Sequence, residues 1–310
     1  MSAPGRSAPT RLRARVVATF GRGNLVRDAD HLDGPVLPAT RRGRKGDVVV
    51  GDVVQCSCAH EQATIESIEP RRTLLFRADQ FRIKELAANI DQVAIVFAPQ
   101  PPFNPLFLWR ALLAAKAADI ASLLVLNKTD IAEGLDAARA AVDFGASLGV
   151  PTLSVSARMQ PEVARSTLLA AFAGRTTLLV GQSGMGKSSL LNLLVDANAR
   201  TQEYSRRLNV GKQTTTASRW FDLPGERGGA LIDTPGFTAF GLAHLSLQQC
   251  ATAMPDFTPF LGNCRFSNCR HLSEPGCAVI AAVERGDVQP QRHAFYRELA
   301  DEIARQVAYP

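Results

Sequence analysis

The order of two short motifs constrains the fold of this chain more than any other feature. Asn127-Lys128-Thr129-Asp130 comes before Gly181-Gln182-Ser183-Gly184-Met185-Gly186-Lys187-Ser188. The second string fits GxxxxGK[ST], the P-loop, whose backbone amides cradle phosphates while its lysine reaches the β/γ oxygens. The first string has the form NKxD, in which an Asp carboxylate accepts hydrogen bonds from guanine N1–H and its 2-amino group.

In an ordinary G domain the P-loop comes first and NKxD follows the switch regions. Here the base-reading tetrad comes first, then the P-loop, then Asp233-Thr234-Pro235-Gly236, which has the DxxG form of a second switch. This order predicts a circularly permuted G domain. Such a permutation is physically permissible because a bound nucleotide fixes where loops meet in space and not their order along the chain.

The residues around the P-loop supply the context that the motif requires. Thr176–Val180 has the composition of a buried strand, and four leucines between 190 and 194 give an apolar helix face after the loop. The helix N-terminus adds free amides and a dipole for anionic phosphates. The alternative is a flexible glycine turn before a helix. We predict phosphate contacts from Gly181, Gln182, Ser183, Gly184, Met185, Gly186, Lys187, Ser188 and Ser189.

Two further loops follow apolar runs and form the predicted guanine site. The NKxD tetrad comes directly after Leu123–Leu126, and Ser156-Ala157 follows the β-like Thr152–Val155. Ligands of open α/β sheets bind at the carboxyl ends of the strands. We expect Asn127, Lys128, Thr129 and Asp130 to bind guanine, with Ser156 and Ala157 supporting O6. A solvated strand-to-helix turn is the alternative for each loop.

A magnesium site is expected beside the phosphates. Asp233 follows the short strand Ala230–Ile232, so its carboxylate would hold Mg²⁺ through a water, and the Gly236 amide would meet the γ-phosphate. Ser188 and Thr215 would supply protein oxygen ligands. Thr214 and Thr216 stay open as alternatives to Thr215, and so does an ordinary threonine-rich loop.

The positive charge of the chain is concentrated at its start. The 310 residues suit two or three domains and carry a formal charge of +6. Residues 1–50 hold ten Arg and Lys against four Asp, so this segment accounts for the whole excess. This segregation predicts a polyanionic partner bound through the N-terminal part, the alternative being a solvated charged surface. No run of eighteen apolar residues or signal-peptide core occurs, so we expect a cytoplasmic protein that does not enter a membrane.

Four segments are expected in chain order: a disordered tail over 1–10, a nucleic-acid-binding OB-fold β-barrel over 11–75, the permuted GTPase domain over 76–244 and a zinc-binding segment over 245–310. The barrel is predicted from β-like runs at Arg15–Phe20, Asp47–Cys56 and Ala63–Ile68 between glycine turns. The GTPase domain alternates helices with apolar runs, which predicts a doubly wound, mostly parallel α/β sheet. Its strand candidates are Val93–Ala98, Leu123–Leu126, Leu153–Val155, Leu178–Val180 and Leu231–Ile232.

Three cysteines and one histidine share a fourteen-residue loop. Cys264, Cys269, His271 and Cys277 form C-x4-C-x-H-x5-C. Three thiolates and an imidazole make a closed tetrahedral site, which predicts one structural Zn²⁺. Unrelated buried thiols or disulfides are the alternatives. Beyond this loop, a helix starting at Pro290 presents an apolar stripe of Phe295, Leu299, Ile303 and Val307.

The ordered set of motifs resembles the ribosome small-subunit-dependent GTPase A family, also called RsgA or YjeQ. The resemblance also covers Val48–Asp52, Asn89–Val93, Asn263–His271 and Glu274–Cys277, and so nearly the whole chain. It implies a monomeric, cytoplasmic GTPase of late 30S subunit maturation. Such a protein binds rRNA through its barrel and zinc domains, is stimulated by the small subunit, and is released once GTP is hydrolysed with Mg²⁺.

The predicted hydrolytic residues are Lys187, Thr215 and Gln213. The family usually has histidine at the position of Gln213. A glutamine can orient the attacking water, as in other GTPases, but cannot act as a protonatable base. Two other functions stay open at this point: an RNA-binding module whose nucleotide pocket only senses GTP or GDP, and an ATP-dependent enzyme. Asp130 argues against the latter, because adenine presents an acceptor at N1.

Overall fold

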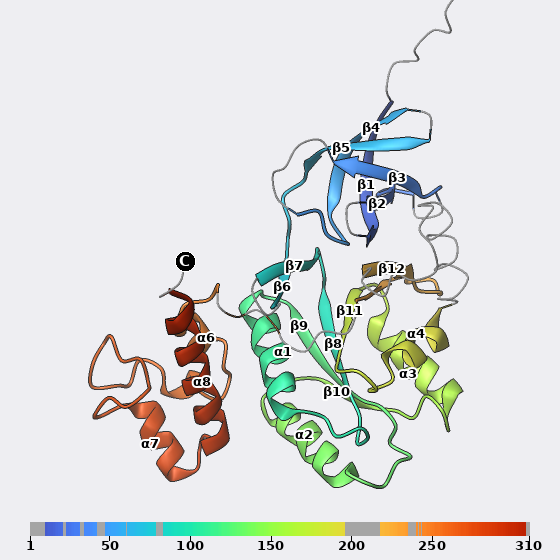
Figure 1. Cartoon of the computed structure of the whole chain (residues 1–310). Helices are drawn as coiled ribbons and strands as arrows, with labels where there is room; N and C mark the ends of the chain where they lie inside the picture. Colours follow the sequence, from blue (N-terminus) through green and yellow to red (C-terminus); the bar gives the residue numbers. More distant parts are fainter. Residues whose placement is uncertain are drawn as a thin grey trace, which may run out of the picture.

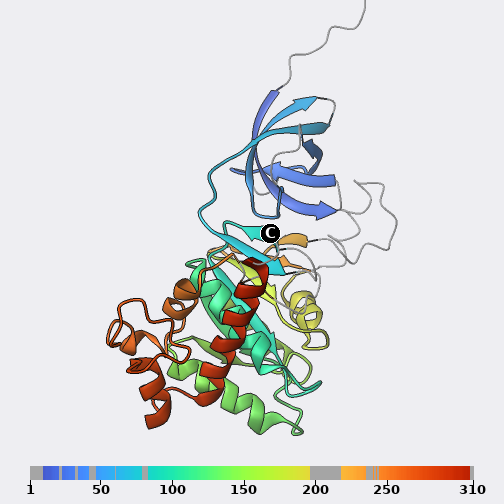
Figure 2. The same cartoon turned by 60° about the vertical axis from the view of Figure 1, so that its left-hand side comes forward.

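The computed structural model describes residues 10–20, 23–31, 34–41, 47–59, 61–78, 83–195, 218–234, 240, 242 and 244–307. An N-terminal barrel stands at one end of a mixed α/β domain, and a C-terminal helical segment lies beside helix α1 (Figures 1 and 2). This arrangement confirms the predicted fold class of barrel, α/β domain and C-terminal segment.

The barrel consists of β1 (Thr10–Phe20), β2 (Gly23–Asp28), β3 (Leu37–Arg41), β4 (Val53–Ala59) and β5 (Gln62–Ile68). The long strand β1 pairs with both β2 and β4, while β5 pairs with β4 and runs parallel to β3, so the sheet closes on itself. Closure removes exposed strand edges. The interior is a small apolar core of its own, formed by Ala14, Val16, Val26, Ala39, Val54, Cys56, Ala63 and Ile65.

The predicted strand Asp47–Cys56 is wrong in its first half. Gly51 adopts φ +92°, and a Cβ there would lie 2.0 Å from the Ala88 carbonyl oxygen. The Asp52 carboxylate accepts a hydrogen bond from the Val49 amide at 2.9 Å. This tight turn ends the extended backbone, because φ > 0 is not a strand conformation. Strand β4 therefore begins at Val53 and continues to Ala59.

The α/β domain is built on a parallel sheet of order β10-β9-β8-β11-β13, flanked by the antiparallel β12. The strands are β8 (Gln92–Phe97), β9 (Ala121–Leu126), β10 (Thr152–Ser154), β11 (Thr176–Val180), β12 (Ser218–Asp222) and β13 (Ala230–Asp233). The predicted strands of this domain all exist, whereas β6, β7 and β12 were not among them. A separate hairpin joins β6 (Leu74–Ala78) to β7 (Ile83–Ala88).

The helices of this domain are α1 (Pro105–Ala117), α2 (Leu135–Ser147), α3 (Pro161–Phe172) and α4 (Lys187–Leu194). Helix α1 packs on β8 and β9, α2 packs on β9 and β10, and α3 contacts α4. Among the described residues, no helix combines the length and the apolar character needed to cross a bilayer.

The C-terminal segment contains α6 (Leu247–Thr252), the 3₁₀ turn η1 (Thr258–Phe260), α7 (Ala278–Arg285) and α8 (Pro290–Val307). As predicted, α8 begins at Pro290 and buries Phe295 and Leu299. The side chain of Val307 lies outside the described residues. Helix α8 packs on α1, since the Phe295 and Trp109 ring centroids are 5.7 Å apart and Arg110 forms an ion pair with Glu302.

The barrel is joined to the α/β sheet through β12. Strand β1 pairs antiparallel with β12, which makes the barrel and the α/β domain one continuous sheet. Arg27 on β2 donates to both Asp222 oxygens, at 2.7 and 2.8 Å. The Arg15 guanidinium lies 4.9 Å from the Trp220 ring centroid. The side chains of Arg27 and Asp222 are only 6% and 19% exposed, so water screens their attraction weakly.

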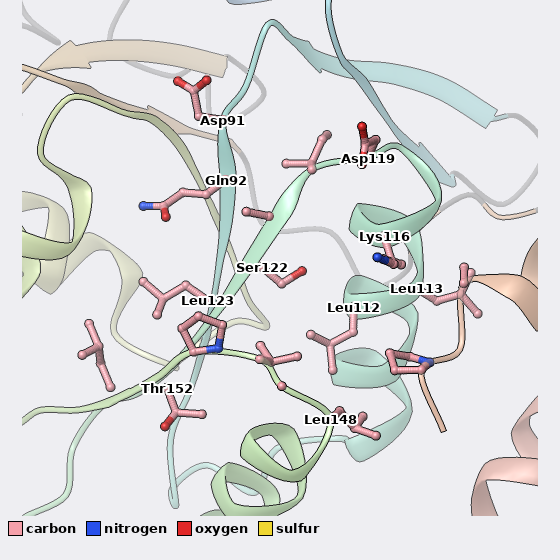
Figure 3. A pocket seen from close by; sticks show the side chains of 18 of the residues that line it. Asp91, Gln92, Leu112, Leu113, Lys116, Asp119, Ser122, Leu123, Leu148 and Thr152 are labelled. Carbon is pink, nitrogen blue, oxygen red and sulfur yellow. The ribbon is translucent and has the colours of Figure 1, made fainter. Parts of the chain in front are cut away.

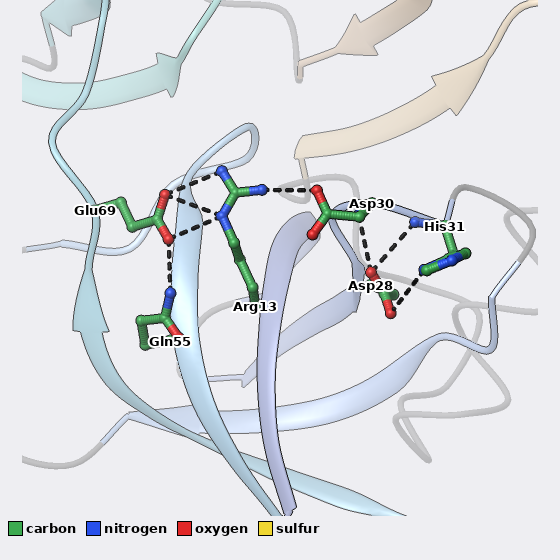
Figure 4. A network of polar contacts seen from close by, with 6 residues as sticks. All are labelled: Arg13, Asp28, Asp30, His31, Gln55 and Glu69. Carbon is green, nitrogen blue, oxygen red and sulfur yellow. Dashed lines mark hydrogen bonds and ion pairs between the residues drawn. The ribbon is translucent and has the colours of Figure 1, made fainter.

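We predict that Arg27→Ala lowers the free energy of unfolding by roughly 3 kcal/mol, because it leaves the Asp222 carboxylate half-buried without its main cation. Urea unfolding checks this value. Arg13→Ala is the matched control: Arg13 bridges Asp30 and Glu69 on the barrel surface (Figure 4), where its side chain is 44% exposed. Equal losses for the two variants would contradict the role of the buried pair.

Candidate nucleotide-binding site

The P-loop of the sequence connects β11 to α4 at the carboxyl edge of the parallel sheet. Gly181, Gly184 and Gly186 all have positive φ, at 156°, 80° and 92°. A Cβ at Gly181 would lie 2.3 Å from the Val96 carbonyl oxygen of β8. The loop therefore lies directly against the neighbouring strand, and its glycines leave amides free to face an anion at the start of α4.

The Asn127 side chain ties the NKxD loop to the P-loop. Asn127 follows β9, is 1% exposed, and donates from Nδ2 to the Met185 carbonyl at 3.2 Å. A Cβ at Gly186 would stand 2.3 Å from this Nδ2, so only glycine leaves room for it. Asn127 Oδ1 accepts from the Ala157 amide at 3.3 Å. One carboxamide thus joins the ends of three loops.

Lys128 adds a second link between the same loops. Its Nζ donates to the Gly184 carbonyl at 2.6 Å and to the Gln100 carbonyl at 2.9 Å. The Lys128 backbone adopts φ +59°, a left-handed conformation that non-glycine residues rarely take. Its aliphatic chain is consequently laid alongside the P-loop rather than pointing into solvent.

Asp130 lies exposed at the end of the tetrad and is oriented by Ser156. The Ser156 hydroxyl donates to Asp130 Oδ1 and accepts from the Met159 amide at 3.2 Å. The Thr129 amide donates to the Val155 carbonyl at 3.3 Å. Sequence reasoning assigned Ser156 only a backbone role and missed this side-chain contact. The structure brings the tetrad and the Ser156-Ala157 loop together as predicted.

Lys187 and Asp233 form the charged part of the site. Lys187 begins α4, and its Nζ donates to the carbonyls of Gly181 and Gln182, the latter at 2.9 Å. Burial lowers the pKa of Lys187, while the Asp233 charge raises it. For Asp233 the signs are reversed: burial raises the pKa of its carboxyl group, while the charges of Lys187 and Arg219 lower it. Each side chain therefore favours the charged form of the other in partly desolvated surroundings. The Lys187 ammonium group is the cation that a bound phosphate would contact.

Some predicted site residues cannot be placed. Gln213, Thr215 with its neighbours Thr214 and Thr216, and Gly236 lie outside the described residues. Ser183, Ser188 and Ser189 are exposed around the start of α4. The predicted magnesium ligand Ser188 is therefore accessible at the P-loop.

A cavity of about 950 Å³ lies elsewhere, at the opposite edge of the sheet (Figure 3). It is lined by Asp91 and Gln92 where β8 begins, by Lys116 and Asp119 near the end of α1, and by Arg292 of α8. Figure 3 shows mixed charges and leucines around it. None of the motif residues lines it, so it is distinct from the nucleotide site.

The predicted metal ligands also converge. The ligand atoms of Cys264, Cys269, His271 and Cys277 lie within 4.8 Å of one another. Cys264 Sγ is 3.9 Å from Cys277 Sγ, and His271 Nδ1 is 3.4 Å from Cys277 Sγ. Tetrahedral bonds of about 2.3 Å would separate two sulfurs by roughly 3.8 Å, so this cluster can hold one metal ion.

The Glu274 carboxylate organises the loop behind the cluster. It accepts hydrogen bonds from the amides of Arg270, Leu272 and Ser273, at 3.2, 2.9 and 3.1 Å. Burial acts to raise the pKa of Glu274, but these backbone donors outweigh it and lower the pKa to about 2. Cys56, Cys58 and Cys250 are free thiols outside this cluster.

Comparison with known proteins agrees with this geometry. The RsgA GTPase family model matches residues 68–243. A small ribosomal subunit biogenesis GTPase RsgA of Paraburkholderia phytofirmans is 46% identical over 97% of this chain and 96% of its own length. One of Ralstonia nicotianae is 44% identical over 98% of both chains. This chain belongs to the RsgA GTPase family.

Solved structures related to the RsgA GTPase family have the same fold. The crystal structure of YloQ, a circularly permuted GTPase, superposes with a TM-score of 0.68 at 25% identity, covering 98% of this chain and 99% of that one. The crystal structure of YjeQ from Thermotoga maritima gives the same TM-score and identity over 95% of this chain. The permuted order inferred from the motifs is therefore confirmed, and this chain is a GTPase.

We predict that Gly186→Ala weakens GDP binding at least roughly tenfold, because the added methyl would displace the Asn127 carboxamide and because alanine resists a φ of +92°. A fluorescent-GDP titration measures this. Gly149→Ala is the control: Gly149 has φ +77° but nothing within 4 Å of an added Cβ. Unchanged GDP affinity in Gly186→Ala would show that the close approach is not required.

Proposed function

We propose that this GTPase acts in late maturation of the small ribosomal subunit, hydrolyses GTP to GDP and phosphate when bound to the subunit, and is released by that hydrolysis. The observation that carries the proposal is the contact of Asn127 with the P-loop, because it joins a base-reading loop to a phosphate loop across the permuted sheet. The relatives that match nearly the whole chain are named as small ribosomal subunit biogenesis GTPases.

The nucleotide would lie along the carboxyl edge of the sheet. The guanine contacts are assigned to Asn127, Lys128, Thr129, Asp130, Ser156 and Ala157, and the phosphate contacts to residues 181–189. Ser188 and Thr215 would ligate Mg²⁺, Asp233 would hold it through a water, and the Gly236 amide would meet the γ-phosphate. Lys187 would then exchange its contacts with the Gly181 and Gln182 carbonyls for β- and γ-phosphate oxygens.

Hydrolysis would depend on Gln213, Thr215 and Lys187. Gln213 would orient the attacking water, since the carboxamide offers both a donor and an acceptor but no titratable proton. Lys187 would neutralise charge that develops on the phosphoryl oxygens. We expect such a site to turn over slowly until the small subunit positions Gln213 beside the attacking water.

We assign the Cys264, Cys269, His271 and Cys277 cluster to one structural Zn²⁺. Three thiolates favour a borderline-soft ion, and four protein ligands leave no position for a catalytic water. A folded preparation without a stoichiometric metal would contradict this assignment.

The partner would be the small subunit and its rRNA, bound by the basic barrel and the zinc segment of a monomeric, cytoplasmic protein. The domain division we propose is a tail over 1–10, the barrel over 11–75, the GTPase domain over 76–244 and the zinc domain over 245–310. Within the basic run that follows β3 in the sequence, Arg41 ends that strand, whereas Arg42, Arg44 and Lys45 lie outside the described residues.

GTP turnover measured with and without 30S subunits tests the function. We expect slow basal hydrolysis that the subunits accelerate, and a Gln213→Ala variant whose stimulated rate falls by up to about 100-fold, because the water loses its orientation. Binding of GTP without any stimulated turnover would favour an RNA-binding module that only senses the nucleotide. An unchanged stimulated rate in Gln213→Ala would remove that residue from the mechanism.

Base recognition has its own test. Asp130→Asn should weaken GTP binding by roughly 10-fold to 100-fold, because two charge-assisted hydrogen bonds are lost, and should shift preference toward xanthosine triphosphate. Competition titrations with both nucleotides measure the shift. Asp119→Asn removes the same charge at the opposite edge of the sheet and should leave the preference for guanine intact. Unaltered selectivity in Asp130→Asn would contradict its role.

A further inference from the structure

One aromatic side chain near the metal-ligand cluster is exposed to solvent. Phe266 is 42% exposed. Among the described residues, the large hydrophobic side chains that are exposed are Phe266, Met159 and Val163, and Phe266 is the one aromatic residue of the three. It lies between Cys264 and Cys269, in the loop that runs along the outer edge of the C-terminal segment (Figures 1 and 2). A phenyl ring held there offers a flat apolar face to a partner.

Arg265 fixes the surroundings of this ring. The Arg265 amide donates to the Gly276 carbonyl at 3.0 Å, and its Cβ would be 2.9 Å from a Cβ at Gly276. Its guanidinium carbon lies 5.4 Å from the Phe266 ring centroid. The arginine is thus packed against the turn and over one face of the ring, so that face already carries a cation and the other face is left for a partner.

A groove of about 380 Å³ lies beside Phe266. The groove adjoins the metal-ligand cluster, because Cys264, Cys269 and His271 line it. Its polar lining is Gln248, Thr252, Ser267, Asn268 and Arg270, and its apolar lining includes Leu247, Ala251 and Leu261. Its described lining residues include no Asp or Glu. The Arg270 side chain is 70% exposed, and its Nε lies 3.9 Å from the Glu274 carboxylate. The groove therefore combines neutral hydrogen-bonding groups with a cation that remains accessible.

The loop is rigid enough to present these groups in one arrangement. Tyr296 of α8 donates from its hydroxyl to the Arg270 carbonyl at 2.9 Å, and the Glu274 carboxylate holds the amide of the same residue at 3.2 Å. A preformed surface loses little conformational entropy on binding.

We propose that Phe266 and this groove bind one unpaired nucleobase of RNA, with the base stacked on the Phe266 ring and its flanking phosphates held by Arg265 and Arg270. Single-stranded RNA is recognised by stacking on aromatic or guanidinium planes and by hydrogen bonds to base edges, and this site offers both. Two exposed arginines without an acidic lining suit a polyanion better than a protein surface. The inference rests on the proposed function and names the RNA contact of the C-terminal segment.

The first test measures 30S binding of Phe266→Ala and Phe266→Trp. Loss of one stacked base should lower the 30S affinity of Phe266→Ala by roughly 5-fold to 100-fold. Phe266→Trp should bind 30S subunits like the wild type, and its tryptophan emission should change on binding. Val163→Ala, which removes an exposed apolar side chain of α3 elsewhere on the surface, is the control and should bind normally. Metal content, thermal unfolding and GDP affinity should match wild type in every variant.

The second test is ultraviolet crosslinking of wild-type chain to 30S subunits, followed by peptide mapping. A crosslink from residues 265–270 to rRNA supports the proposal. Equal binding by Phe266→Ala, or a crosslink from this loop to a ribosomal protein, would overturn it while leaving the GTPase function intact. Wild-type chain that fails to bind 30S subunits at all would overturn the proposed function together with this inference.

Discussion

The contact between the Asn127 carboxamide and the P-loop backbone is the interaction on which the rest of the site depends. Asn127 Nδ2 donates to the Met185 carbonyl across β8, and Asn127 Oδ1 accepts a hydrogen bond from the Ala157 amide of the next loop. It can do so because parallel strands bring their carboxyl ends to the same edge. The glycine at 186 leaves the necessary space. This geometry is therefore independent of the order in which the circular permutation places the two loops along the chain.

A single strand, β12, separates the DxxG strand β13 from the barrel. Strand β12 pairs on one side with β1, as Ser218 opposite Thr19, and on the other with β13, as Arg219 opposite Asp233. The charge of Arg219 lowers the pKa of Asp233, and its guanidinium carbon lies 5.6 Å from the Phe20 ring centroid of β1. Arg219 of β12 is therefore a single side chain that lies against the barrel and also affects the charge of Asp233.

Sequence reasoning found most elements because their signals are local. It found the parallel strands from their apolar runs, the P-loop from its glycines and α8 from Pro290. It overlooked α6, although Ser246 and Gln249 form a capping box that can be seen in the sequence. It overlooked β12 because five residues carry no clear period and because its partner β1 lies some two hundred positions earlier. The false start of the strand at Asp47 came from a valine run that the Gly51 turn interrupts.

The sequence by itself determined the chemistry of this protein: which residues can read guanine, cradle phosphate and ligate a metal, and in what permuted order they come. Those properties reside in side-chain types and short spacings. Only the tertiary structure decided that Ser156 orients Asp130, that Arg27 and Asp222 join the barrel to β12, and that Phe266 stays exposed beside a groove. These facts depend on packing between distant segments, and burial and distance are properties of the folded chain rather than of any stretch of it.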